Sequence, residues 1–362
     1  LKYFSKENKI FLMGFNNGLN EKRKKQLEKY CHLFLVPEPS TYNKNLNSFS
    51  LLTTGKSNNF TYSQKIEKTI AKLISLDNFD IIQAESLGMV EYIFNLPESR
   101  IKTVFSNDDI VLRRFNREIK NAGLIRKIWL KMQLPKVEKL EKKSLEQFDL
   151  ILTVTDEEKN YLKKLDFQAN IDIYSYDINL DIYNLDKKQH EGFNLLFSAN
   201  FNHKPNIDAL KYLDKEIMPN IKNDKIKLLI TGNCPIKTTS KNMECLGFVE
   251  NYKEILSKTD LIISPLRLGG GIRIKNLEAM AYGLPVLTSN IGNEGINAEN
   301  NNNILLANDK EGFIEQINWA FGNPEKLITI GDAGRKLIKD KFDSEKINKH
   351  LEETYSNLCD RS

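Results

Sequence analysis

Strand-like and helix-like segments alternate along almost the whole chain. Short apolar runs that suit buried strands lie at residues 9–15, 32–37, 79–85, 101–106, 148–155, 195–199, 227–231, 261–265, 286–289 and 304–307. Longer segments with helical periodicity lie between them, at residues 21–30, 62–76, 109–146, 206–217, 254–258, 273–282, 311–321 and 324–341. Such alternation is typical of βαβ units, in which a helix connects each strand to the next parallel one. The sequence therefore predicts an α/β fold with parallel sheets.

The chain is long enough for two such domains. It has 362 residues, and its polar segment 176–192 is the expected linker between them. Hydrophobic residues make up 40% and charged residues 28%, which is the balance of a globular protein. No apolar run approaches the roughly 18 residues of a membrane span. The four cysteines and four histidines show no metal-ligand spacing, so we expect free thiols, a cytoplasmic location and no metal site.

Much of the excess positive charge lies between residues 100 and 143, in a chain of net charge +5. No stacking-aromatic motif accompanies it, so nucleic acid is not the expected partner. The segment 121–143 (NAGLIRKIWLKMQLPKVEKLEKK) combines apolar and basic residues, and such a segment can lie on an anionic membrane, here the inner face of the plasma membrane. The alternative is a helix packed on the first domain, which the sequence favours slightly.

A glycine-rich stretch, PLRLGGGIRIKNLEAMAYGLPVLTS (265–289), carries the strongest indication of chemistry. The glycines 269–271 follow a strand and precede a helix, whose free N–H groups and dipole attract anions. Arg273 and Lys275 fall in the first helical turn, where cations oppose that dipole. This placement indicates that a strongly negative group, such as a diphosphate, binds there. One turn later, Glu278 can accept hydrogen bonds from two hydroxyls, as on a ribose.

The alternative for this stretch is a capped helix with a solvated basic turn. Two other phosphate-binding loops are excluded by the spacing. Lys275 does not follow a glycine directly and is not followed by Ser or Thr, so the stretch is no Walker loop. It also lacks the third glycine of the dinucleotide-binding fingerprint.

The second half resembles the donor-binding domain of the family 4 (group 1) glycosyltransferases, which have the GT-B fold. The resemblance covers residues 193–341 and rests on several motifs in the family's order: LLFSANFNHKPNIDALKYLDKEIMPNI, LLITGNCP and LGFVENYKEILSKTDLIISPLRLGGGIRIKNLEAMAYGLPVLTSNIGNEGI. The first half matches more weakly, through FDIIQAES, NDDIVLRRF and FDLILTVTDEEKNYL.

The resemblance implies two Rossmann-like, doubly wound parallel-sheet domains that face a cleft. Residues 1–178 would bind the acceptor and residues 179–341 a nucleotide sugar, with a C-terminal helix at 342–362 that packs back toward the first domain. The implied activity is that of a retaining hexosyltransferase. It would transfer a sugar from a nucleotide diphosphate sugar to a glycan or lipid-linked acceptor, in cell-wall or other cell-surface polysaccharide biosynthesis. The family works without a bound metal, and no cofactor is expected.

Carried over residue by residue, the motif assigns the donor diphosphate to Gly270, Gly271, Arg273 and Lys275. The two cations would stabilise the charge that builds on the departing diphosphate. Glu278 corresponds to the second glutamate of the family's E-x7-E motif and would bind the ribose hydroxyls.

Three further residues are assigned to the donor more loosely. Phe248 and Val249, after Gly247, lie where the family's chain passes the base, and ordinary core positions are the alternative. Lys204 would add a second phosphate contact, with a solvated loop lysine as the alternative.

The sequence also departs from the family's pattern. Gly270 replaces the first glutamate of E-x7-E, and Ala199 stands where a glycine is expected after the first strand of the second domain. Where many relatives place a histidine that faces the reacting sugar, this chain has Asp108, with Asp109 as the alternative register. A helix N-cap is the competing interpretation for either aspartate.

The first five residues, LKYFS, resemble the end of the family's first helix, so the first strand of the N-terminal domain is expected to be missing. Either the natural protein starts earlier or this is a shortened product. A non-catalytic subunit that binds and stabilises an active relative is therefore the alternative function. A sugar-nucleotide epimerase is less well supported, because no catalytic carboxylates for it can be identified.

Overall fold

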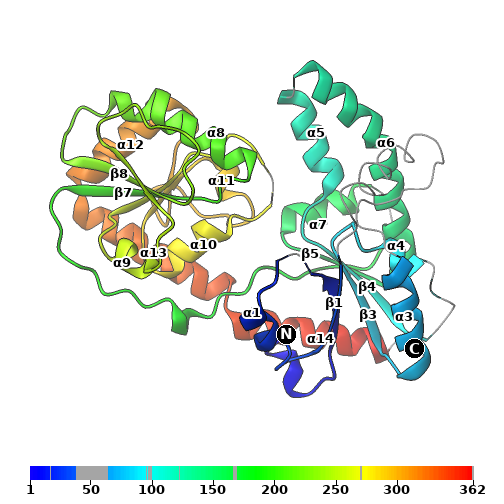
Figure 1. Cartoon of the computed structure of the whole chain (residues 1–362). Helices are drawn as coiled ribbons and strands as arrows, with labels where there is room; N and C mark the ends of the chain where they lie inside the picture. The colour runs from blue at the N-terminus through cyan, green and yellow to red at the C-terminus, as the bar shows by residue number, and fades with distance from the viewer. Residues whose placement is uncertain are drawn as a thin grey trace. The chain divides into compact units, whose positions relative to one another are not determined.

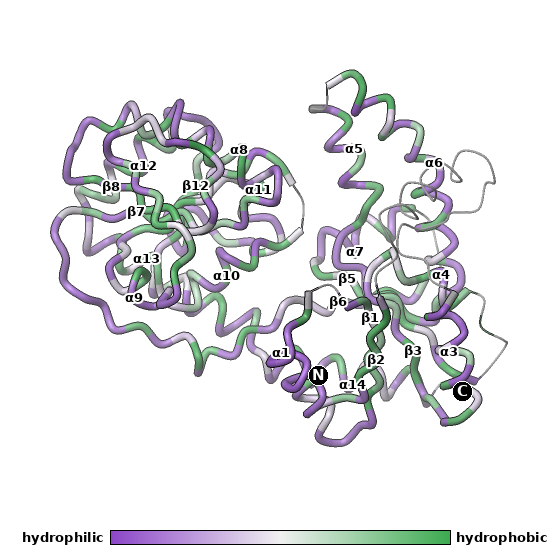
Figure 2. The backbone as a smooth tube through the Cα atoms, viewed as in Figure 1, coloured by the Kyte–Doolittle hydropathy of each residue, from purple (hydrophilic) through white to green (hydrophobic). Residues whose placement is uncertain are grey.

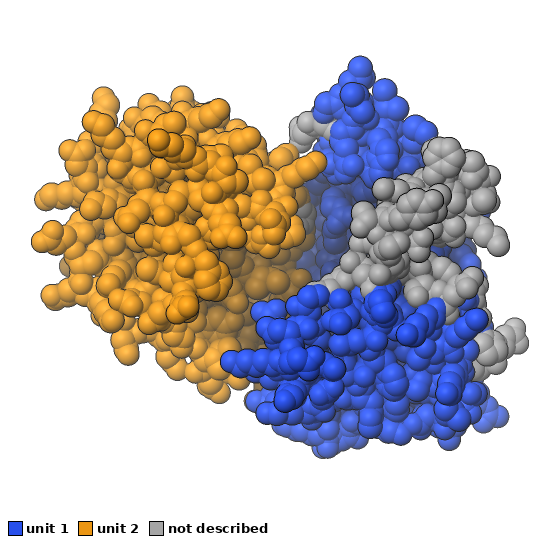
Figure 3. Space-filling model, in the orientation of Figure 1, with its two compact units in different colours: residues 1–174, 348–362 blue, residues 175–347 orange. Residues whose placement is uncertain are grey.

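The computed structural model describes residues 1–16, 18–37, 64–94, 96, 100–121, 123–165, 169–269 and 271–360. It contains two compact units (Figure 3). The first unit comprises residues 1–174 and 348–362, and the second comprises residues 175–347. The second unit is thus continuous in sequence, whereas the first is completed by a segment from the other end of the chain.

The second unit is built on a six-stranded parallel sheet with the order β12-β11-β10-β7-β8-β9. Its strands are β7 (Phe193–Ser198), β8 (Ile226–Thr231), β9 (Met243–Gly247), β10 (Leu261–Ser264), β11 (Val286–Thr288) and β12 (Leu305–Leu306). The chain runs from β7 outward to β9 and then returns to the other side of β7. This reversal makes β7 and β10 neighbours, and ligands of open α/β sheets bind at such a switch point.

Helices cover both faces of this sheet (Figure 1). The helices of the unit are α8 (Lys204–Tyr212), η3 (Leu213–Ile217), η4 (Met218–Asn220), α9 (Tyr252–Ser257), α10 (Ile274–Ala281), α11 (Asn290–Asn293), α12 (Lys310–Gly322) and α13 (Pro324–Lys341), and the short η2 (Leu180–Ile182) lies in the segment before β7. Because both faces are covered, the central strands are apolar throughout: all of β10 is buried, and Leu195 and Phe197 in β7 are 0% exposed. Figure 2 shows this concentration of hydrophobic residues along the central strands.

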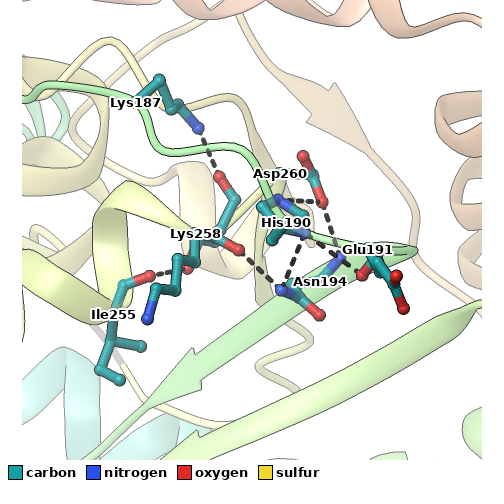
Figure 4. A network of polar contacts seen from close by, with 8 residues as sticks. Lys187, His190, Glu191, Asn194, Ile255, Lys258 and Asp260 are labelled. Atoms are coloured by element: carbon teal, nitrogen blue, oxygen red, sulfur yellow. Dashed lines mark hydrogen bonds and ion pairs between the residues drawn. The ribbon is translucent and has the colours of Figure 1, made fainter.

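The segment expected as a linker, residues 176–192, is attached to the second unit by polar contacts (Figure 4). The Lys187 ammonium donates to the Thr259 carbonyl, and the backbone N–H of Lys188 donates to the Ser257 carbonyl at 3.0 Å. His190 Nε2 lies 3.3 Å from a carboxylate oxygen of Asp260. The segment therefore belongs structurally to the second unit.

The strands of the first unit fall into two parallel sheets in the described residues. One pairs β1 (Phe11–Phe15) with β2 (His32–Val36), and the other has the order β3-β4-β5-β6, formed by Ile81–Glu85, Lys102–Asn107, Leu150–Thr153 and Ile171–Ile173. The helices of this unit are η1 (Phe4–Lys6), α1 (Glu21–Leu27), α3 (Gln64–Leu76), α4 (Glu91–Phe94), α5 (Val111–Asn121), α6 (Leu124–Gln147) and α7 (Asp156–Lys163).

The last helix, α14 (Ser344–Asp360), begins in the second unit and from Asn348 onward belongs to the first. Leu351 and Leu358 pack against the buried face of β4 and β5, where Val104 and Leu150 are 0% exposed. The Thr354 hydroxyl also donates to the Asp172 carboxylate at 3.0 Å. The helix thus supplies part of the first unit's core.

The ten strands expected from the sequence are all present, but two strands were missed. β6 has three residues, and in β9 two of the five side chains are exposed, so neither carries a clear apolar pattern. The helical stretch expected at 109–146 is two helices, with Gly123 as the N-cap residue of α6. In the described residues, no helix combines the length and the hydropathy required to cross a membrane.

Candidate donor-binding site

A small pocket of about 90 Å³ lies at the switch point of the second unit's sheet. It is lined by Ser198, Tyr252, Leu256, Ile262, Ile263, Ser264, Lys275, Glu278, Ala279 and Tyr282. Ser198 ends β7 and Ser264 ends β10, so the pocket opens at the carboxyl ends of the two strands that meet at the switch. The Ser264 hydroxyl oxygen is buried and has no hydrogen-bond partner among the described residues. The pocket is therefore polar at its strand side and can accept a small polar group.

The glycine loop joins β10 to α10 and brings Arg273 close to its own backbone. Gly269 has a φ of +111°, and a Cβ atom placed there would lie 2.6 Å from the Arg273 Nη2 atom. Gly271 also has a positive φ, of +74°. The backbone conformation favours glycine at position 269, because a side chain there would be strained, and the Arg273 head group would have to shift to make room for it. Gly270, which was assigned to the diphosphate, lies outside the described residues.

Arg273 is the N-cap residue of α10, and Lys275 lies in its first turn, as expected. The Lys275 ammonium is 3.4 Å from the Asn206 Oδ1 atom and 4.7 Å from the centre of the Phe197 ring. Among the residues that the structure describes, no carboxylate lies within ion-pairing distance of it. Burial, with a smaller contribution from the Arg273 charge, lowers the pKa of Lys275 to about 7. Lys275 therefore lies where an anion would restore its charge.

Glu278 lies one turn further along α10 and lines the same pocket. Its Oε1 atom accepts a hydrogen bond from the Tyr183 hydroxyl at 3.3 Å. The Tyr183 ring packs edge-on against the Tyr282 ring, with centroids 4.9 Å apart. Lys275 and Glu278 thus bring a cation and a carboxylate to one pocket, as a phosphate and a hydroxyl pair would require.

Of the residues assigned to the donor, only Lys275 and Glu278 line this pocket; Gly271, Arg273, Lys204, Phe248 and Val249 are described but do not line it. Lys204 is exposed at the start of α8, so the interpretation as a solvated lysine fits its position. Phe248 and Val249 follow β9 at the edge of the sheet, and the Phe248 side chain is 82% exposed. The alternative of Phe248 as an ordinary core residue is therefore wrong, while Val249 is half-buried.

Asp108 belongs to the first unit, directly after β4. Its side chain is exposed at the surface, yet partial withdrawal of the carboxyl from water and, to a lesser extent, the neighbouring Asp109 raise its pKa. Asp109 forms an ion pair with Arg114. α5 begins at Val111, so both aspartates lie just before its first turn, and the N-cap interpretation stays open for either.

Several residues that line the pocket or contact its lining side chains were not identified from the sequence. Ser198 and Ser264 could have been found, because a polar residue at the carboxyl end of a buried parallel strand lies at the ligand-binding edge. Tyr183 gave no such signal, since it lies in a polar segment 95 residues before Glu278. Asn206, in the first turn of α8, is brought to Lys275 only by the fold of the whole unit.

Part of the chain matches a known protein family. The family model described as glycosyl transferases group 1 matches residues 192–323. An uncharacterised 44.6 kDa protein in the cps region of Klebsiella pneumoniae is 24% identical over 180 residues, which cover 46% of each chain. The chain thus matches about half the length of that relative.

Solved structures are similar over nearly the whole chain. Sucrose-phosphate synthase from Thermosynechococcus elongatus has a TM-score of 0.67 at 14% identity, with 99% of this chain and 98% of that chain covered. HepE from Anabaena, solved in complex with UDP-glucose, has a TM-score of 0.62 at 15% identity, with 94% and 90% covered. At such identities the likeness shows the fold alone. The chain has the GT-B fold, and its residues 192–323 form a domain of the group 1 glycosyltransferase family.

Proposed function

We propose that the protein transfers a sugar from a nucleotide diphosphate sugar to a glycan or lipid-linked acceptor, with retention, in the synthesis of a cell-surface polysaccharide. The observation that carries the proposal is the position of Lys275. It lies beside Arg273 at the start of α10, at the switch point of the sheet, and no carboxylate in the described residues forms an ion pair with Lys275. The description of HepE with UDP-glucose and of the Klebsiella relative in a cps region supports the choice of substrates.

The chain's own residues account for the main demands of such a transfer. Negative charge develops on the leaving diphosphate, and fixed cations in a partly dry site stabilise it more than water does. Lys275 gains its full positive charge when the anion approaches, because the anion offsets the burial and the repulsion by Arg273 that lower its pKa. Because Arg273 and Lys275 would offset the negative charge of the diphosphate, the proposal includes no metal. In a retaining transfer the leaving phosphate takes the acceptor's proton, so no strong protein base is required.

Glu278 is proposed to bind the ribose through its carboxylate, which lines the pocket next to Lys275. Asp108, in the first unit, is proposed to act on the acceptor side of the reaction. Phe248, which is largely exposed after β9, is proposed to meet the base, with Val249 beside it and Lys204 near the phosphates. The exposed side chains of Phe248 and Lys204 would thus become covered when the donor binds.

A peripheral contact with an anionic membrane is part of the proposal. Five apolar side chains on the first two turns of α6 are exposed by more than a third: Leu124, Ile125, Ile128, Trp129 and Met132. Lys131 is exposed among them, and the Arg126 guanidinium lies 4.4 Å above the Trp129 ring. Figure 1 shows α5 and the start of α6 extending beyond the sheet of the first unit. Apolar side chains flanked by cations fit a bilayer surface rich in anionic lipids.

The test of the proposed activity combines binding and turnover. Purified protein is titrated calorimetrically with UDP, GDP, ADP and dTDP and then incubated with the matching nucleotide sugars and a set of polyprenyl-phosphate-linked saccharides. Release of nucleoside diphosphate that depends on acceptor supports transfer, and NMR of the product reports the anomeric configuration. Nucleotide binding without any turnover would favour a non-catalytic subunit. Failure to bind any of the four nucleotides would overturn the assignment of the pocket.

A further inference from the structure

Tyr183 lies outside the elements expected to form the donor site, yet it touches the carboxylate that is proposed to bind the ribose. It directly follows η2, in the segment that precedes β7. Its hydroxyl donates to Glu278 Oε1 at 3.3 Å, and burial is the main cause that raises the pKa of Tyr183 to about 12. The phenol therefore remains a hydrogen-bond donor through the neutral and mildly alkaline range.

The backbone around Tyr183 is fixed from two directions. Arg335, on α13, donates through Nη1 to the Tyr183 carbonyl at 2.6 Å and also to the Ala281 carbonyl at the end of α10. Lys253, on α9, donates to the Ile182 carbonyl at 3.3 Å. The segment that carries Tyr183 is thus joined to the helix that carries Glu278.

Close packing of α13 on the turn after α10 brings Arg335 to this place. A Cβ atom on Gly331 would lie 2.4 Å from the Gly283 carbonyl oxygen, so only glycine permits the approach. One turn further along α13, Arg335 reaches both carbonyls. The edge-on contact between the Tyr183 and Tyr282 rings fixes the plane of the phenol. Both ends of the hydrogen bond to Glu278 are therefore held by packed elements.

We propose that Tyr183 is a positioning residue that holds the Glu278 carboxylate in the orientation that receives the ribose hydroxyls. The inference rests on the proposed function and deepens it. An ionised carboxylate offers about four acceptor sites, and Tyr183 uses one of them on Oε1. A neutral donor leaves the negative charge in place for the two ribose hydroxyls. It also restricts rotation of the side chain, so that less orientational freedom is lost on binding.

The opposite role is physically distinct. If the Tyr183 hydroxyl occupied the place of a ribose hydroxyl, a nucleotide would have to displace it. Removal of the hydroxyl would then tighten binding, whereas loss of a positioning contact weakens it.

The experiment compares Tyr183→Phe with the parent protein, with Glu278→Gln and with a matched control, Tyr212→Phe. Tyr212 lies in the same unit, with its ring against Phe313 and Arg267, and lines no part of the pocket. Calorimetry measures three ligands: the nucleoside diphosphate that the parent binds best, its 2′-deoxy form, and inorganic pyrophosphate. Melting temperatures check that every variant folds.

Tyr183→Phe should weaken binding of the ribonucleotide by roughly 3- to 10-fold, within the range of the net contribution of one hydrogen bond. The affinity for the 2′-deoxy form should fall less, so that the ratio between the affinities for the two forms decreases. The affinity for pyrophosphate should not change. A merely structural effect would weaken all three ligands alike. In turnover, KM for the donor should rise while kcat changes less than about 2-fold. Arg335→Met should also weaken binding of the ribonucleotide. The double variant should bind it only slightly more weakly than Tyr183→Phe alone.

Two results would overturn the inference in different ways. If Glu278→Gln weakens ribonucleotide binding while Tyr183→Phe binds as well as the parent or more tightly, only the role of Tyr183 is wrong. If the parent binds none of the nucleotides, or Glu278→Gln binds like the parent, the proposed donor site fails and the role of Tyr183 fails with it.

Discussion

The two units bury ionisable groups of opposite sign, and they treat them differently. In the first unit, Glu141 and Glu158 are each 2% exposed, and burial raises the pKa of both to about 7. Backbone N–H groups of the same unit donate to one oxygen of each carboxylate: Leu112 donates to Glu141 Oε1 at 3.1 Å and Val154 to Glu158 Oε2 at 3.3 Å. In the second unit, burial lowers the pKa of Lys275 to about 7, and its contacts are an amide oxygen and an aromatic ring.

A shifted pKa therefore has two meanings in one molecule. Glu141 on α6 accepts from the first turn of α5 and so joins two helices, which is a role in the fold. Lys275 contacts the Asn206 amide oxygen at 3.4 Å, has no carboxylate within ion-pairing distance among the described residues, and lies in a pocket, which is the arrangement expected of a binding site. The size of the shift does not separate the two cases. What separates them is where the group lies: Glu141 joins two helices in the core of the first unit, whereas Lys275 lines a pocket.

The largest effect is expected from removal of the cations at the start of α10. Arg273→Ala and Lys275→Ala should each lower kcat/KM by about 10- to 100-fold, since charge-assisted hydrogen bonds contribute about 1.5–3 kcal/mol each. Lys211→Ala, which removes an exposed lysine of α8, is the matched control. Steady-state kinetics with the preferred donor decide the matter. Equal activity of all three variants would remove the contrast between the units.

The next effect concerns Glu141. Its folded pKa lies above the unfolded value of about 4.5, so the folded state holds the proton more tightly, and stability should fall as pH rises from about 4.5 to 7. Glu141→Gln should remove this dependence and raise the free energy of unfolding of the first unit at pH 8 by about 2 kcal/mol. At pH 4.5 the variant and the parent should unfold alike.

Urea unfolding, followed at pH 4.5 and pH 8, measures this difference. Glu146→Gln on the same helix is the control, because Glu146 is exposed. A Glu141→Gln variant that is less stable than the parent at pH 8 would mean that the ionised carboxylate stabilises the fold.

A smaller effect is expected on the pH dependence of nucleotide binding. In the free protein Lys275 loses its proton near pH 7, while a bound diphosphate would raise its pKa. Binding above pH 7 then requires uptake of a proton, and affinity should fall about tenfold between pH 6.5 and 8.5. Lys275→Arg should flatten the profile, because arginine remains charged. Calorimetry in buffers of different ionisation enthalpy counts the protons, and no uptake by the parent would contradict the prediction.

The smallest effect is expected at the membrane. Lys131→Gln should reduce binding to vesicles that contain phosphatidylglycerol by about fivefold, since a surface lysine contributes about 1 kcal/mol. Lys211→Gln in the second unit should have no effect. Flotation with neutral and anionic vesicles measures both variants. Equal recovery of the parent with the two vesicle types would rule out electrostatic attachment of α6.

The sequence predicted the parts of the site whose signal is local. The glycine loop, Arg273, Lys275 and Glu278 lie within ten residues of one another, and helix periodicity places Lys275 and Glu278 on one side of α10. The environment of Lys275 could not be predicted, because Phe197 and Asn206 come from a strand and a helix about 70 residues earlier. The role of Asp108 also stays a prediction, since it depends on an acceptor whose chemistry leaves no motif in the chain.

The strands show the same limit. β10 was predictable because every side chain of Leu261–Ser264 is buried, which gives a continuous apolar run. β9 at the sheet edge mixes buried and exposed side chains and shows no period. Pairing with β8 decides that it is a strand, and pairing is a property of the folded unit.

The path of α14 has a consequence for the order in which the chain folds during synthesis. Domains generally fold as they emerge, the N-terminal one first. Here residues 348–360 supply Leu351 and Leu358 to the core of the first unit, and they are made only after residues 175–347. All residues of the second unit are therefore synthesised before the segment that covers the apolar face of β4 and β5. We expect the N-terminal half of this protein to complete its core last.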